Sequence, residues 1–108
     1  MHTKEFDLGR LSDPSLLILT SLTSGPKHGY AMMEDILEFC GTKLEPGTLY
    51  AAIARLERRG WIDALEAEDR RRPYRITGAG EQALREQMKT LHRVVSIGQQ
   101  RLTEASQT

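Results

Sequence analysis

Arginine side chains are concentrated between residues 55 and 75 of this chain. Seven residues in that interval are arginines, and three of them are consecutive at Arg70–Arg72. Guanidinium groups bind phosphate oxygens through charge-assisted hydrogen bonds, so such a cluster favours the backbone of a nucleic acid. The chain carries 15 basic and 15 acidic residues and no net charge, which counts against nucleic-acid binding. The distribution of charge matters more than its sum, because a neutral protein can carry one basic face.

An amphipathic helix is predicted directly before the arginine-dense turn. It begins at Pro46, because proline is favoured at the first helical position. Leu49, Ile53 and Leu56 follow at spacings of four and three, which places them on one inward stripe. The outward face opens with small residues, which is unusual unless something must approach closely. This face consists of Gly47, Thr48, Ala51, Arg55 and Arg58.

Two short strands are predicted after this helix. Gly60 ends the helix, and residues 61–66 and 72–76 form a hairpin around the polar turn at residues 67–71. A helix followed by a basic hairpin is the arrangement of a winged helix-turn-helix, in which the helix enters the major groove and the hairpin reaches the flanking backbone. The predicted fold class is therefore mainly α (α+β), a winged helix-turn-helix with a two-stranded wing.

Two further helices are expected to complete this domain, which spans residues 13–77. Asp13 and Pro14 predict a helix start as N-cap and first helical residue, and the Leu-Leu-Ile-Leu run that follows is too apolar for a surface helix. A second helix is expected at about residues 29–39. Residues 1–12 are expected to be a loose, polar N-terminal segment.

The last predicted helix, residues 78–102, is expected to be a dimerisation helix with Thr77 as its N-cap. Apolar residues recur along it at alternating spacings of four and three over about three heptads. The globular part has little surface left to cover them, so a second copy is the expected cover. Gly98 either lets two backbones approach or marks fraying, and residues 103–108 are expected to be disordered. The expected dimer interface comprises Leu84, Met88, Leu91, Val94, Val95, Gly98 and Leu102.

Four motifs make the chain resemble the PadR family of bacterial transcriptional regulators, in its short form with one C-terminal helix. They are specific as a set, in this order and spacing over about residues 14–91. The resemblance implies a homodimeric winged-helix repressor that binds a palindromic operator and is often released by a small hydrophobic effector. The chain departs from the family at Ala51, where proline is common, and at Trp61, where an aliphatic residue is more common. The motifs are His28-Gly29-Tyr30, Gly47-Thr48-Leu49-Tyr50, Arg55-Leu56-Glu57 with Gly60, and Arg71-Arg72-Pro73-Tyr74-Arg75-Ile76-Thr77 with Gly80.

Several of these residues have a purely structural alternative. Tyr30 and Tyr50 also fit hydrogen-bonded tyrosines of the core, and Arg70–Arg72 also fits a solvated, charged turn. Trp61 is typical of a packing residue, and stacking on a flat ligand is the less favoured interpretation.

The sequence indicates neither an enzyme nor a metal site. It contains no nucleophile elbow, Gly-rich phosphate loop or paired-carboxylate signature. His2, His28 and His92 do not stand at metal-ligand spacing, so no metal or other cofactor is expected. Cys40 is the single cysteine, which excludes an internal disulfide and fits a reducing cytoplasm. No apolar run is long enough to span a membrane.

We therefore expect a cytoplasmic, homodimeric, DNA-binding transcriptional repressor. Its expected partners are double-stranded operator DNA, a second copy and a small hydrophobic effector. A winged-helix module that binds proteins rather than DNA is the alternative, because zero net charge permits it. The expected DNA-binding residues are Tyr30, Gly47, Thr48, Tyr50, Ala51, Arg55, Arg70, Arg71 and Arg72.

Overall fold

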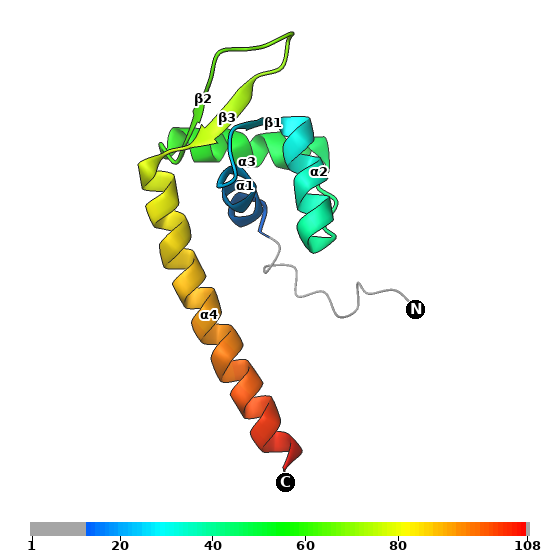
Figure 1. The fold of residues 1–108 in the computed structure, drawn as a ribbon, viewed down its shortest axis with the longest axis vertical. Helices are drawn as coiled ribbons and strands as arrows, with labels where there is room; N and C mark the ends of the chain where they lie inside the picture. Colours follow the sequence, from blue (N-terminus) through cyan, green and yellow to red (C-terminus); the bar gives the residue numbers. More distant parts are fainter. Residues whose placement is uncertain (1–12, 108) are drawn as a thin grey trace.

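The computed structural model describes residues 13–107. Three short helices and a small sheet gather into one body, and a long last helix extends away from it (Figure 1). No helix in the described part of the chain is both long and apolar enough to cross a membrane. The elements in chain order are α1 (Pro14–Leu22), β1 (Lys27–His28), α2 (Gly29–Cys40), α3 (Pro46–Arg58), β2 (Ile62–Ala64), β3 (Pro73–Ile76) and α4 (Gly78–Ser106).

The helix starts follow from local chemistry. The Asp13 carboxylate accepts a hydrogen bond from the Ser15 N–H at 2.8 Å, and the Thr77 hydroxyl accepts one from the Gly80 N–H at 3.0 Å. Both side chains satisfy a backbone donor that the first helical turn leaves open. Pro46 opens α3, and Gly41 caps the end of α2 with a φ of 75°. The two N-caps and the start at Pro46 confirm the sequence prediction.

The core lies where α1, α2, α3 and the sheet meet. Leu49, Ala52, Ile53 and Leu56 are all buried on one side of α3, as the spacing of the stripe predicts. They pack with buried residues of the other elements, so the outward face of α3 is held in place by the core. These partners are Leu17, Ile18, Leu19 and Leu22 of α1, Met32 and Ile36 of α2, Leu44, Ile62 and Leu84.

The sheet has three antiparallel strands, in the order β1-β3-β2. The hairpin of β2 and β3 confirms the wing, although its strands are shorter than the predicted 61–66 and 72–76. The added strand is β1, in which Lys27 pairs with Tyr74 and His28 pairs with Pro73. Two residues carry no periodic pattern, so the sequence alone did not reveal β1. Its effect is to fix the start of α2 beside the wing.

The last helix is longer than predicted. It was expected to end at Leu102 with a disordered tail at 103–108, but it continues to Ser106. Nothing in residues 103–106 breaks a helix, and Glu104 accepts a hydrogen bond from the Gln100 side chain at 3.3 Å. The expectations for residues 1–12 and for Thr108 lie outside the described residues.

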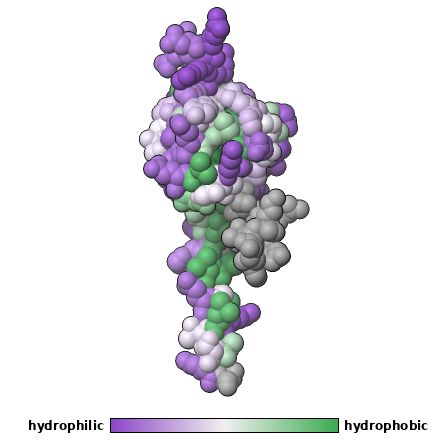
Figure 2. All heavy atoms as spheres, turned by 90° about the vertical axis from the view of Figure 1, so that its right-hand side faces the viewer, coloured by the Kyte–Doolittle hydropathy of each residue, from purple (hydrophilic) through white to green (hydrophobic). Residues whose placement is uncertain are grey.

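The apolar face of α4 divides into two parts. Leu84 is only 7% exposed and packs in the core of the same protomer, so it does not belong to an open interface as expected. Beyond it the apolar side chains lie open, and Figure 2 shows hydrophobic surface along the part of α4 that leaves the body. We call this stretch the α4 seam. The exposed side chains on it and beside it are Met88, Val94, Val95, Ile97 and Leu102, with Leu91 half-buried among them.

Candidate nucleic-acid interface

The tip of the wing is a tight turn at which Arg70 and Arg71 are exposed to solvent. The backbones of Glu68 and Arg71 exchange hydrogen bonds at 2.7 and 2.8 Å, and Asp69 and Arg70 between them have φ values of 49° and 69°. Left-handed backbone costs a residue with a side chain roughly 1–2 kcal/mol relative to glycine. The turn therefore retains Arg70 at a position where glycine would be more stable.

The wing, α2 and α3 together form one hollow, which we call the wing hollow. It unites five of the nine residues predicted to bind DNA, namely Tyr30, Tyr50 and Arg70–Arg72. Among the described residues that line it, none carries a carboxylate, so the site favours an anion. The lining consists of His28, Gly29, Tyr30, Tyr50, Arg70, Arg71, Arg72 and Tyr74.

His28 places a hydrogen-bond donor next to Arg71. Its Nδ1 accepts from the Ala31 N–H at 3.4 Å, which puts the proton of the neutral imidazole on Nε2. That Nε2 lies 3.4 Å from Nη1 of Arg71. Both groups are then donors and cannot satisfy each other. An acceptor placed between them, such as a phosphate oxygen, would satisfy both.

The tyrosines of the hollow are largely open to solvent. Tyr30 is 59% exposed and Tyr50 is 49% exposed, so neither is a buried core tyrosine. Tyr74 is more enclosed, and burial, together with Glu57 and Tyr50, raises the pKa of its phenol above the usual value of 10. Tyr74 therefore stays protonated at neutral pH and remains a hydrogen-bond donor.

The other predicted contacts lie on α3 and outside the hollow. Gly47, Thr48, Ala51 and Arg55 are all exposed on the outward face of this helix. The absence of large side chains at its start leaves room for a close approach. α3 and the wing hollow thus present two adjoining surfaces, one with small residues and one with cations.

Not all arginines are equally available. Arg72 donates from Nη1 to the Leu65 carbonyl at 2.7 Å, and Arg75 forms an ion pair with Asp63 at 3.4 Å. Arg59 lies over the Trp61 ring, 5.0 Å from its centre, in a cation–π contact. Arg70 and Arg71 are therefore the wing arginines with the most freedom to meet a phosphate.

Comparison with known proteins decides the family. Residues 18–86 match the model of the transcriptional regulator PadR-like family, which is more than half of the 108-residue chain. The chain belongs to the PadR-like family of transcriptional regulators. Family membership confirms the predicted resemblance, and the proteins of this family are transcriptional regulators rather than enzymes.

Solved structures agree with this assignment. A transcriptional regulator from Clostridium thermocellum has a TM-score of 0.71 and 29% identity, over 77% of this chain and 86% of that one. A PadR family transcription regulator from Clostridium difficile has a TM-score of 0.75 over 82% of this chain and 97% of that one. Its identity is 22%, so it supports the fold alone. Together these matches confirm the winged-helix fold class.

A relative from Streptomyces fradiae is much longer than this chain. It is an uncharacterised 37.1 kDa protein in a transposon, 39% identical over 85 residues. The match covers 79% of this PadR-family chain but only 25% of that relative.

Three residues of the wing hollow were not among the predicted DNA contacts. His28, Gly29 and Tyr74 belong to the PadR motifs, but none of them was predicted to bind DNA. His28 reaches the hollow because β1 pairs with β3 beside the wing. The available signal was the motif itself, since His28 and Tyr74 each stand two residues from a predicted contact, Tyr30 and Arg72 respectively.

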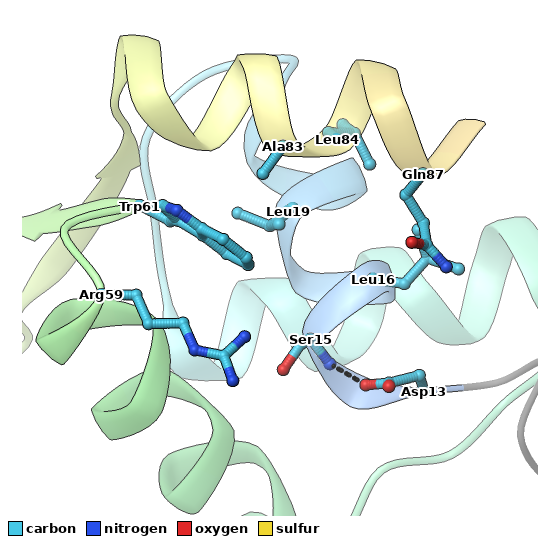
Figure 3. Close-up of a pocket in the computed structure, with 9 residues that line it drawn as sticks. All are labelled: Asp13, Ser15, Leu16, Leu19, Arg59, Trp61, Ala83, Leu84 and Gln87. Carbon is cyan, nitrogen blue, oxygen red and sulfur yellow. Dashed lines mark hydrogen bonds between the residues drawn. The ribbon is translucent and has the colours of Figure 1, made fainter. Parts of the chain in front are cut away.

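A second cavity lies on the other side of this PadR-family fold, where α4 leaves the body. Its volume is about 180 Å³. Figure 3 shows the Trp61 ring and Arg59 on one side of it and residues of α1 and α4 on the others. Trp61 is half-buried against the core, which fits its predicted packing role and also gives the cavity an aromatic wall. The lining is completed by Asp13, Ser15, Leu16, Leu19, Ala83, Leu84 and Gln87.

Proposed function

We propose that this chain is a cytoplasmic homodimeric repressor that binds a palindromic DNA operator. The observation that carries the proposal is the wing hollow. There, donors from α2, α3 and the wing converge on one space. Within it, Nε2 of His28 and Nη1 of Arg71 stand 3.4 Å apart, and with the imidazole proton on Nε2 both can donate to one acceptor. A backbone phosphate of DNA supplies that acceptor.

In this proposal, α3 reads the major groove. Gly47, Thr48 and Ala51 allow its first turns to approach the bases, and Ala51 offers an apolar contact to a thymine methyl group. Arg55 lies one turn further along the same exposed face and reaches a base edge or a phosphate. The arginines of the wing bind flanking phosphates and position the protein without specifying sequence.

The proposed dimer rests on the α4 seam. Met88, Val95 and Leu102 are 43%, 52% and 71% exposed in the protomer, and their heptad spacing suits a second helix. Burying them against a second copy would remove a large apolar surface from water. A two-fold dimer would also place two α3 helices on the two halves of a palindrome.

We further propose that a small planar effector acts at the cavity beside Trp61. Its volume of about 180 Å³ slightly exceeds the roughly 150 Å³ that accommodates benzene in an engineered protein cavity. A ligand there would contact both α1 and α4, and so would bias the angle between the dimer helix and the DNA-binding body. Planar aromatic compounds that bind the protein should lower its operator affinity. If none of the binding compounds alters that affinity, the effector proposal is wrong.

The experiment that tests DNA recognition is a selection of genomic fragments by the purified protein at physiological salt. We expect enrichment of fragments that share one palindromic site. Recovery of no fragment above background would instead favour a winged-helix module that binds proteins.

Variants on the two surfaces should affect DNA binding differently. Arg70→Ala and Arg71→Ala should weaken binding to the selected operator and to mixed-sequence DNA about equally, because phosphate contacts carry no sequence information. Thr48→Ala and Arg55→Ala should weaken operator binding more than mixed-sequence binding. Fluorescence anisotropy with both duplexes measures the two affinities. A change of sequence preference in the wing variants alone would reverse the two roles.

A further inference from the structure

Gly29, the first residue of α2, is in direct contact with Tyr50 of α3. A Cβ atom built on Gly29 would collide with the Tyr50 hydroxyl and would lie 2.7 Å from Cζ of the same ring. It would also lie 3.1 Å from Cδ2 of Leu49. The absence of a side chain at position 29 is therefore what allows the tyrosine ring to lie against the start of α2.

The location of that contact gives the tyrosine hydroxyl a specific environment. Gly29 and Tyr50 both line the wing hollow, together with His28 and Arg71. The N-terminus of α2 contributes the positive end of a helix dipole to this space. The Tyr50 hydroxyl is thus held in the same hollow as the His28 and Arg71 donors.

We propose that Gly29 is a positioning residue for DNA binding, which holds the Tyr50 hydroxyl where it donates to the same backbone phosphate as His28 and Arg71. This inference rests on the proposed function. Gly29 itself touches no DNA in this account, and its effect acts entirely through Tyr50. Tyr50 is 49% exposed, so a Cβ atom at position 29 would displace its ring toward solvent, while the buried Leu49 side chain would have to shift by only a few tenths of an ångström.

Gly29→Ala should therefore weaken DNA binding without unfolding the protein. A lost hydrogen bond to a charged group corresponds to roughly a tenfold or greater rise in Kd. We expect this rise for a short mixed-sequence duplex at low salt, measured by anisotropy, and a melting temperature close to that of the unaltered protein. Gly78→Ala is a matched control, since Gly78 is also the first residue of a helix and a Cβ there meets nothing within 4 Å.

A double-mutant cycle separates positioning from direct contact. Tyr50→Ala removes the ring that Gly29 accommodates, so Gly29→Ala should have no further effect on Kd in that background. Equal losses from Gly29→Ala in both backgrounds would show that DNA approaches Gly29 itself and would overturn the inference. An unchanged Kd for Gly29→Ala alone would also overturn it. Failure of the unaltered protein to bind the duplex would overturn the proposed function and, with it, this inference.

Discussion

Replacing Leu91 and Val95 together with glutamate should convert the protein from a dimer to a folded monomer. Val95 is 52% exposed in the protomer, and Leu91 is half-buried, so most of the new charge is solvated when the chain is alone. In the proposed dimer both carboxylates would be buried without partners, and each uncompensated buried charge costs roughly 3–5 kcal/mol. Light scattering at micromolar concentration should show half the mass of the unaltered protein, while circular dichroism should retain the helical signal.

A charge-matched variant on the opposite face of α4 controls for electrostatic repulsion. Arg93→Gln with Gln100→Glu changes the net charge by the same amount, and both side chains are exposed and lie away from the α4 seam. This variant should remain dimeric. A Leu91→Glu, Val95→Glu protein with the mass of the unaltered dimer would show that α4 does not hold the subunits together.

Gly80→Ala should destabilise the fold itself. Gly80 is buried in the first turn of α4, where a Cβ atom would collide with the Trp61 carbonyl oxygen and lie 2.9 Å from Cγ1 of Ile76. The carbonyl cannot move away, because it accepts a hydrogen bond from the Thr77 N–H at 3.0 Å. Overpacking of this kind costs roughly 1–3 kcal/mol, and urea unfolding at a fixed protein concentration measures it.

The first turn of α4 also contains the residue for a control substitution. Gly78→Ala, two residues earlier and with open space around it, should leave the unfolding midpoint nearly unchanged. Equal midpoints for the Gly78 and Gly80 variants would mean that α4 can shift against Trp61 at little cost. The start of α4 would then not be fixed by backbone contact with the body.

Local signals in the sequence predicted much of the fold. Asp13, Pro46 and Thr77 mark helix starts because capping depends on a few adjacent residues. The stripe of α3 follows from helical periodicity. The predicted end of α4 at Leu102 is wrong, because no stop residue follows Leu102 and a polar helical turn has the same composition as a disordered tail.

Contacts between segments that lie far apart in the sequence could not be predicted from such local patterns. The pairing of β1 with β3 brings His28 to the wing, and the approach of Gly29 to Tyr50 joins two helices. Neither leaves a periodic trace in the sequence. Leu84 continues the spacing of the α4 seam, yet it is buried by its own protomer, because periodicity reports an apolar face and not its partner. The sequence already separated the predicted contacts of the helix from those of the wing, but it did not reveal that Tyr30 and Tyr50 line one hollow with Arg70–Arg72.

The most direct test of the account is the salt dependence of binding to mixed-sequence duplex DNA. If the wing hollow and α3 bind the backbone, log K should fall linearly as log salt concentration rises, with a slope of about −0.9 for each phosphate neutralised. Arg71→Ala should reduce the magnitude of that slope by about one. We expect measurable affinity at about 50 mM salt and a loss of several orders of magnitude by about 200 mM if six or more phosphates are contacted. Absence of affinity for any duplex at low salt, or an affinity that does not change with salt, would contradict DNA binding by this surface.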